Sequence, residues 1–116
     1  MTATGASEYI TKPQTLTEMT MTLVDLLNRA DNSNLPAPAH VTLYQRWQEA
    51  RLGFRGEPDS FHALADWATR FGGTVTAEPY TRDDGEQSID CQVKFPFVGL
   101  AVEVYAMIPA DQLSST

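Results

Sequence analysis

The sequence predicts an α+β domain, a two-layer sandwich in which two helices cover one face of a mainly antiparallel five-stranded sheet, in the order α-β-β-α-β-β-β. Two segments carry apolar residues at the three- and four-residue spacing of a helix face. Five others are strand-like, and most of them alternate apolar and polar residues, as strands with one buried face do. The connections are short, which favours antiparallel neighbours. A chain of 116 residues supports a single domain.

The first expected helix begins after Pro13. Thr15 and Glu18 have the spacing of a capping box, in which a hydroxyl and a carboxylate each bind a free backbone amide. Its apolar stripe consists of Leu16, Met19, Leu23, Leu26, Leu27 and Ala30. The turn-forming run 31–34 and the prolines within 35–38 end the helix. We expect residues 1–12, which show no period, to form a flexible arm, and 13–116 to form the domain.

The next two segments, His40 to Trp47 and Ala50 to Arg55, form the expected first hairpin. A two-residue loop at Gln48-Glu49 pairs Arg46 with Arg51. This register places Leu43 opposite Phe54 and puts Val41, Leu43, Leu52 and Phe54 on one face. The other face then carries a patch formed by Tyr44, Arg46, Arg51 and Arg55. Gln-Glu is not a favoured pair for a two-residue turn, so a longer loop remains an alternative.

The second half of the chain predicts a helix followed by three strands. Asp59 or Ser60 can cap this helix, which presents Phe61, Leu64, Ala65, Trp67, Ala68 and Phe71 on one side and ends at Gly72-Gly73. The strands cover residues 74–80, 88–97 and 100–108, with turns at 83–86 and 98–99. Cys91 falls on the inward side of its strand, so we expect a buried thiol in the core.

Several of these strings carry a family resemblance. They are Leu35-Pro36-Ala37-Pro38, the strand pair, Ala65-Asp66-Trp67-Ala68 running to Phe71-Gly72-Gly73, and Gly99 to Ala106. Over about residues 35–106 the chain resembles a class of short uncharacterised proteins of actinobacteria and their phages. The resemblance implies a cytoplasmic protein of a bacterium or mobile element, and it brings no activity or site residues.

Composition and charge exclude several classes of function. Residues 57–116 carry three basic and ten acidic side chains, so the whole net charge of −7 lies in that half. Phosphate backbones repel such a chain, which argues against direct nucleic-acid binding. One cysteine makes no internal disulfide and no zinc site by itself. No apolar run approaches the length of a membrane span. We therefore expect a cytoplasmic protein without cofactor or metal.

Histidine offers little for catalysis. His62, Asp66 and Arg70 are spaced by four residues on the second helix and could form an Asp-oriented general base. No serine, cysteine or metal-ligand set completes that arrangement, and a solvated polar edge with an Asp–Arg pair is the favoured explanation. We expect His40 to lie at a strand edge rather than to bind a metal. A small enzyme that uses His62 and Asp66 is therefore the third hypothesis.

The leading hypothesis is a non-catalytic protein-interaction module that binds through the patch, because Arg and Tyr dominate interface hot spots. A second copy of the chain is one candidate partner. Glu103 and Asp90, expected to be exposed on the later strands, could instead satisfy the arginines. The second hypothesis is an acidic decoy that imitates nucleic acid and inhibits a host nucleic-acid-handling or defence protein. Its surface would consist of Glu78, Asp83, Asp84, Glu86 and Asp90.

Overall fold

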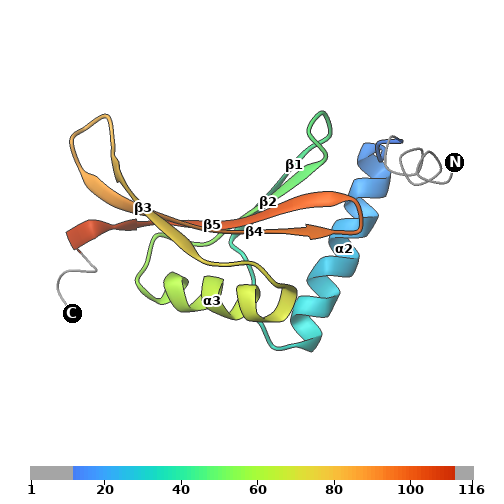
Figure 1. The fold of residues 1–116 in the computed structure, drawn as a ribbon, viewed down its shortest axis with the longest axis horizontal. Helices are drawn as coiled ribbons and strands as arrows, with labels where there is room; N and C mark the ends of the chain where they lie inside the picture. Colours follow the sequence, from blue (N-terminus) through green and yellow to red (C-terminus); the bar gives the residue numbers. More distant parts are fainter. Residues whose placement is uncertain (1–11, 112–116) are drawn as a thin grey trace, which may run out of the picture.

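The computed structural model describes residues 12–111 as two helices packed on one five-stranded sheet (Figure 1). Along the chain the elements are α2 (Leu16–Asn32), β1 (His40–Tyr44), β2 (Glu49–Gly53), α3 (Asp59–Phe71), β3 (Thr76–Thr81), β4 (Gln87–Phe97) and β5 (Leu100–Pro109). The α+β class expected from the sequence is confirmed. The expected N-terminal arm, apart from Lys12, lies outside the described residues.

The sheet is mixed, which corrects the expectation of a mainly antiparallel one. Its spatial order is β1-β2-β5-β4-β3, and β2 pairs with β5 in parallel. The other pairings, β1 with β2, β3 with β4 and β4 with β5, are antiparallel. Short connections alone would have placed β2 and β3 side by side. The last two strands of the chain, β5 and β4, lie between them instead.

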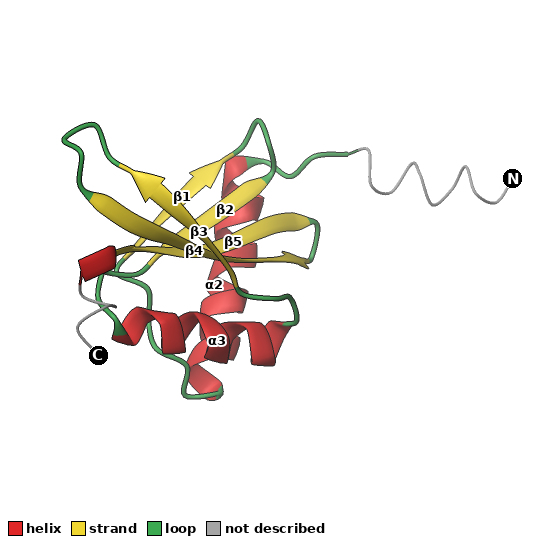
Figure 2. Cartoon of the chain, turned by 60° about the vertical axis from the view of Figure 1, so that its left-hand side comes forward, coloured by secondary structure: helices red, strands yellow, loops and turns green. Residues whose placement is uncertain are grey.

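Helix α3 is the physical reason for this arrangement. It follows β2 and crosses beneath the sheet before the chain enters β3 at the far edge (Figures 1 and 2). Two tight antiparallel turns then bring β4 and β5 back toward the middle, so β5 meets β2 in the same direction. Parallel neighbours need a long crossover connection, and α3 supplies it.

The core lies between the helices and one face of the sheet. Both helices contribute to one buried cluster, with Met19, Leu23, Leu26 and Ala30 from α2 and Leu64 and Trp67 from α3. The sheet contributes Ala50, Leu52, Cys91, Val93, Phe95, Leu100, Val102, Val104, Ala106 and Ile108. Cys91 is fully buried, as its place in the alternation predicts. We call this the inner face of the sheet and the opposite one the outer face.

The start of α2 confirms the capping box. The backbone N–H of Glu18 donates to the Thr15 hydroxyl over 3.1 Å, and the N–H of Thr15 donates to the Glu18 carboxylate over 2.8 Å. Hydrogen bonding of the Glu18 carboxylate to Thr15, chiefly to the Thr15 backbone N–H, lowers the pKa of Glu18. The helix therefore begins where two amides without helical partners are satisfied.

The predicted register of the first hairpin is wrong. Arg51 pairs with Thr42, not Arg46, and Leu43 pairs with Ala50, not Phe54. The connecting turn is the four-residue run 45–48. Gln48 takes a positive φ of 52°, and its side-chain amide donates to the Gln45 carbonyl over 2.8 Å. The register is displaced by an even number of residues, so each side chain of the paired strands keeps its expected face.

Trp67 fixes the connector that leads into β1. It is fully buried on α3, and its indole N–H donates to the Pro36 carbonyl over 3.0 Å. Its ring packs against those of Phe54 and Phe71, with centroids 6.3 and 5.4 Å away. The connector, α3 and the sheet are thereby held together at one point. Neither helix within residues 12–111 is long and apolar enough to cross a membrane.

Candidate functional site

The outer face of the sheet is the surface that the described chain leaves uncovered. Both helices pack on the inner face, and no element of residues 12–111 crosses the outer one (Figures 1 and 2). The β1–β2 and β3–β4 hairpins rise on this side of the sheet at its two ends (Figure 1). Strand pairing sets the rows of side chains that stand on it.

One row crosses the middle of the sheet and carries alternating charge. It runs Thr42, Arg51, Glu103 and Lys94 over β1, β2, β5 and β4. The guanidinium of Arg51 donates twice to Glu103 Oε2, over 3.0 Å from Nε and 2.8 Å from Nη2. Lys94 Nζ lies 4.0 Å from Glu103 Oε1. Glu103 is therefore only 8% exposed, which corrects the expectation of an exposed carboxylate.

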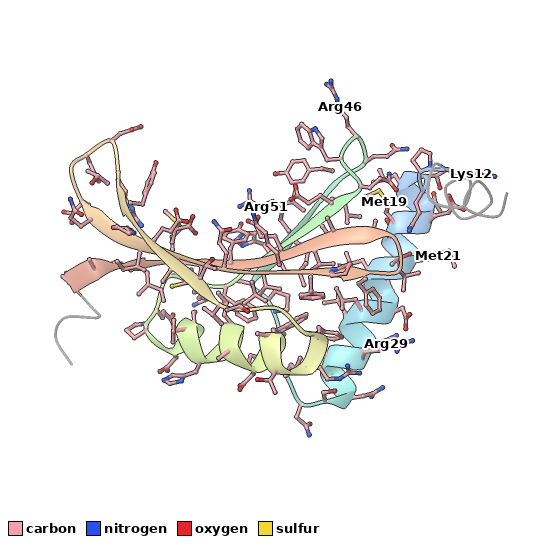
Figure 3. All side chains as sticks on the ribbon, in the orientation of Figure 1. Lys12, Met19, Met21, Arg29, Arg46 and Arg51 are labelled. Atoms are coloured by element: carbon pink, nitrogen blue, oxygen red, sulfur yellow. The ribbon has the colours of Figure 1, made fainter. Side chains whose placement is uncertain are left out.

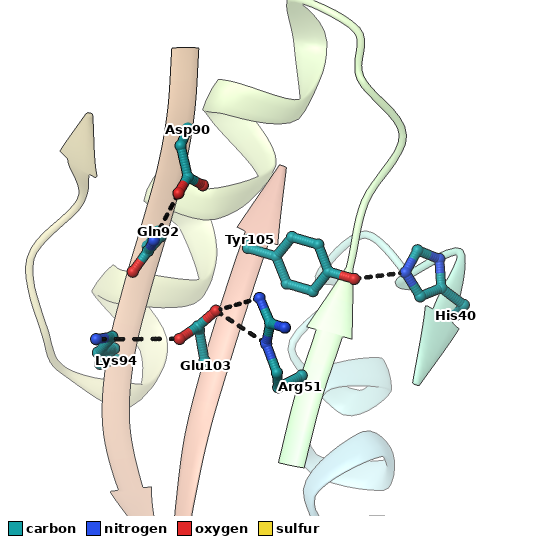
Figure 4. Close-up of polar contacts among 7 residues, drawn as sticks. All are labelled: His40, Arg51, Asp90, Gln92, Lys94, Glu103 and Tyr105. Atoms are coloured by element: carbon teal, nitrogen blue, oxygen red, sulfur yellow. Dashed lines mark hydrogen bonds and ion pairs between the residues drawn. The ribbon is translucent and has the colours of Figure 1, made fainter. Parts of the chain in front are cut away.

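The neighbouring row carries a contact between His40 and Tyr105 (Figure 4). Their side chains meet over Gly53, which lies between them on β2, and His40 Nε2 is 2.7 Å from the Tyr105 hydroxyl. A Cβ at residue 53 would overlap the His40 ring, so only glycine leaves room for this contact. The Arg51 guanidinium lies over the Tyr105 ring, 4.5 Å from its centroid. The two rows thus form one network across four strands.

Electrostatics hold Arg51 in its charged form. Partial burial, the largest single effect, works to lower the pKa of the guanidinium. The hydrogen bonds and negative charge of Glu103 act in the opposite direction and leave the pKa of Arg51 raised. Arg51 is therefore paired with Glu103 and stacked on Tyr105, and it is not an unpaired cation.

A hollow of about 290 Å³ adjoins this network near the β4–β5 turn. It is lined by Glu49, Lys94, Phe95, Pro96, Ala101, Val102 and Glu103. Ala101 pairs with both Glu49 and Pro96, and its small side chain leaves the space between them. Glu49 is half-buried and takes part in none of the ion pairs within residues 12–111. The hollow therefore combines apolar walls with charged groups of both signs, the Glu49 and Glu103 carboxylates and the Lys94 ammonium.

An aromatic pair stands beside the outer face at the tip of the β1–β2 hairpin. The Tyr44 and Trp47 rings lie 5.5 Å apart, and Trp47 is 63% exposed. Gln48 anchors the tip to the segment before α2, because its side-chain amide accepts from the Gln14 N–H over 2.7 Å and donates to the Gln14 carbonyl over 3.0 Å. The exposed ring of Trp47 is therefore carried on a fixed turn.

The four residues of the predicted patch do not lie together. Tyr44 and Arg51 stand on the outer face as expected. Arg46 lies in the turn and points away from the sheet (Figure 3). Arg55 follows β2 at the other end of that strand, where its carbonyl accepts from the Glu57 N–H and the Ser60 hydroxyl. The wrong register is the cause, because it put Arg46 directly opposite Arg51.

The five acidic residues of the second hypothesis lie on one hairpin. Glu78 pairs with Asp90 across β3 and β4, while Asp83, Asp84 and Glu86 lie in the connecting turn. Four of the five are exposed, and Asp90 is half-buried. The ion pairs within residues 12–111 include none of them. Like charges opposite each other on a strand pair are destabilising, so this is an unusual feature.

His62 does not line the hollow that Asp66 and Arg70 border, so the residues of the third hypothesis do not share it. His62 and Asp66 are both exposed on α3. A hollow beside Asp66 is lined by Ser33, Asn34, Leu35, Thr69 and Arg70, without His62. The Arg70 side chain donates to the Ser33 hydroxyl over 2.8 Å. Within residues 12–111, no group of three or more His, Cys, Asp or Glu side chains is placed to hold a metal ion.

The sequence interpretation missed Trp47, His40 and Tyr105 as site residues. The alternation predicts Trp47 at the end of a strand, whereas the structure places it in the turn. A signal for the other two was available in Gly53, because an isolated glycine within a strand indicates close approach of another group.

Comparisons with known proteins give no relative to interpret this surface: a scan against family models found no match, and neither curated proteins nor solved structures gave a significant one. The resemblance to short actinobacterial and phage proteins therefore stays a prediction. The function must be argued from the geometry of the outer face.

Proposed function

We propose that the chain is a non-catalytic protein-interaction module that binds a protein partner through the outer face of its sheet. The observation that carries this proposal is the contrast between the two faces. Helices α2 and α3 pack against the inner face, whereas no helix or strand of residues 12–111 packs against the outer face, whose side chains form a defined network. The proposed contact surface consists of Tyr44, Glu49, Arg51, Lys94, Glu103 and Tyr105 on the outer face, together with Arg46 and Trp47 on the exposed tip of the β1–β2 hairpin.

The chemistry of this surface fits a protein partner. Tyr, Trp and Arg are the side chains most enriched at interface hot spots. The network fixes Arg51 and Tyr105 before binding, which reduces the entropy lost on association. The hollow between Glu49 and Pro96 would accept a partner side chain with an apolar body and a polar tip, because apolar atoms line it beside the charged groups of Glu49 and Lys94.

The test is capture of partners from an actinobacterial lysate, the setting that the family resemblance implies, with variants of the hairpin tip. Trp47→Ala combined with Arg46→Ala should abolish capture of a specific partner and leave the fold unchanged. Both side chains are exposed, and neither belongs to the core. A hot-spot residue costs about 2 kcal/mol or more on truncation, which corresponds to roughly a thirtyfold loss of affinity.

Two control variants make this test specific. Val98→Ala changes an exposed apolar side chain in the β4–β5 turn and should retain the partner. Arg70→Ala changes an exposed cation on α3, on the other side of the sheet, and should also retain it. Equal capture by wild type and the double variant contradicts the proposal, because binding would then use another surface.

The acidic hairpin supports a second candidate function, an acidic decoy that occupies the phosphate-binding surface of a nucleic-acid-handling protein. The specific observation is that Glu78 and Asp90 face each other beside the three carboxylates of the turn. Association of this kind should weaken steeply as salt rises. Replacing all five residues by Asn or Gln should remove both the binding and its salt dependence. Capture that is insensitive to salt contradicts this candidate.

A further inference from the structure

The edge strand β1 lacks the features that usually prevent strand addition. It lies at one end of the sheet, so the backbone groups on its far side have no strand partner within residues 12–111. Its five residues, His40 to Tyr44, include no proline, lysine or carboxylate. Proteins commonly protect edge strands with proline, charge or bulges, because an open edge pairs with another chain.

The opposite edge strand, β3, is protected by a proline and by a charged residue. Pro79 removes a backbone donor in the middle of the strand, and Glu78 adds a charge. All six residues of β3 are exposed, whereas β1 includes three half-buried ones. The two edges of the same sheet therefore differ in their capacity to accept a strand. Only the β1 edge is compatible with addition.

A hollow of about 210 Å³ lies directly beneath the β1 edge. It is lined by Leu27, Ala30, Asp31, Pro36, Ala37, Pro38, Val41 and Trp67, of which all but Asp31 are apolar. Val41 and Leu43 pair with the buried residues Leu52 and Ala50, so both face the inner side. They are only half-buried because no strand of residues 12–111 lies beside β1 along its open edge. An added strand would need apolar side chains at these alternate positions.

We infer that a second copy of the chain supplies this strand, with β1 pairing antiparallel to its own copy about a two-fold axis at Thr42. This arrangement places Val41 of one copy opposite Leu43 of the other, on the inner side. The Leu43 side chain then reaches the hollow that Val41 borders. His40 lies opposite Tyr44, and the two Thr42 side chains meet on the outer side, where Thr–Thr pairs are favourable.

The chain is thus self-complementary at this edge. β1 itself has the apolar alternation that the edge and its hollow require, and its lack of Asp, Glu, Lys and Arg avoids like-charge repulsion at the axis. A two-fold contact closes on itself, so the product is a dimer and not a fibre. The dimer would join the two outer faces into one continuous ten-stranded sheet, formed from two five-stranded ones. The inference concerns the edge and does not depend on the function proposed for the outer face.

The test uses opposite charges at the axis. Wild-type protein should form a dimer in sedimentation and light-scattering measurements. Thr42→Glu and Thr42→Lys should each be monomeric, with dimerisation at least tenfold weaker, because each places two like charges in direct opposition. An equal mixture of the two variants should restore association as a heterodimer. Thr42 is exposed, so neither change disturbs the core, and circular dichroism checks the fold.

Thr76 provides the matched control, since it is an exposed threonine on the outer side of the other edge strand. Thr76→Glu and Thr76→Lys should leave the dimer intact. A wild-type protein that stays monomeric up to about 1 mM, the weak end of specific association, overturns the inference. So does a dimer that survives in both Thr42 variants, because the two copies would then meet elsewhere. Either failure leaves the partner-capture result with Trp47 and Arg46 unaffected.

Discussion

His40 and Tyr105 meet over Gly53, with 2.7 Å between the imidazole Nε2 and the phenolic oxygen. The residues are 65 positions apart in the chain and lie on β1 and β5, two strands that are not neighbours. The intervening strand contributes no side chain at this position, so the two rings touch above its backbone. This contact links the exposed edge of the sheet to the Arg51–Glu103 pair at its centre (Figure 4).

We expect a coupling free energy of about 1 kcal/mol between His40 and Tyr105, the usual net value of one protein hydrogen bond. A double-mutant cycle with His40→Ala and Tyr105→Phe, followed by urea unfolding, measures it. In a Gly53→Ala background the coupling should fall to near zero. The new methyl group would displace the ends of both rings, Tyr105 Cζ being 2.8 Å from the added Cβ. Undiminished coupling in that background would show that glycine is not what permits the contact.

Arg51 should be the most important cation of the outer face for stability. Arg51→Met leaves the Glu103 carboxylate nearly buried without its two hydrogen bonds. Removing one partner of a buried pair costs about 3–5 kcal/mol. The Arg51 side chain is 36% exposed, so we expect a smaller loss of about 1–3 kcal/mol, because solvent screens such a pair. Urea unfolding measures the change in the free energy of unfolding.

Two further variants separate the contributions at this site. Arg51→Met with Glu103→Leu should recover most of the lost stability, because no buried charge is then left without a partner and Lys94 stays exposed to solvent. Lys94→Met is the matched control on the same carboxylate. Lys94 is 70% exposed and 4.0 Å away, so its loss should cost less than about 0.5 kcal/mol. Equal losses for Lys94→Met and Arg51→Met would contradict the ranking.

Local signals in the sequence predicted most of the elements but not their spatial order. The capping box of Thr15 and Glu18 and the glycines after Phe71 act within a few residues, so they could be identified directly. The parallel pairing of β2 with β5 depends on where α3 carries the chain. Periodicity gives the face of a strand and does not give its neighbour, which is decided by packing of the whole core.

The candidate site, too, could be predicted only where local signals decide. Alternation correctly placed Tyr44 and Arg51 on the outer face. Separating Arg46 from Arg51 requires the correct register, which depends on the conformation of the Gln45–Gln48 turn. The hydrogen bonds from Gln48 to Gln14, 34 positions away, help to fix this turn. A contact over such a sequence separation cannot be deduced from turn propensities alone.

Cys91 should react slowly with thiol reagents in the native protein. It is fully buried, and desolvation, assisted by the nearby Asp90 charge, raises the pKa of its thiol above the usual 9.0. The thiolate is the reactive form, so both burial and the raised pKa suppress reaction. A chromogenic disulfide reagent should label Cys91 only at the rate of opening or unfolding, and rapidly in denaturant. Rapid labelling of the folded chain would show that the core opens near β4.

Acid should weaken the start of α2 through Glu18. Its folded-state pKa lies below the usual 4.5, because the carboxylate accepts hydrogen bonds from Thr15. A lowered folded-state pKa means that the stabilisation is present above pH 4.5 and is lost as the pH falls through the folded-state value. Glu18→Gln keeps a side-chain acceptor without a titrating charge, so its stability should depend less on pH in this acidic range. Thermal unfolding of both proteins between neutral and acidic pH measures this difference.

Asp25→Asn, which removes an exposed carboxylate from the middle of the same helix, is the control and should retain the acid dependence of Glu18. Parallel stability curves for wild type and Glu18→Gln would contradict the role assigned to this capping box.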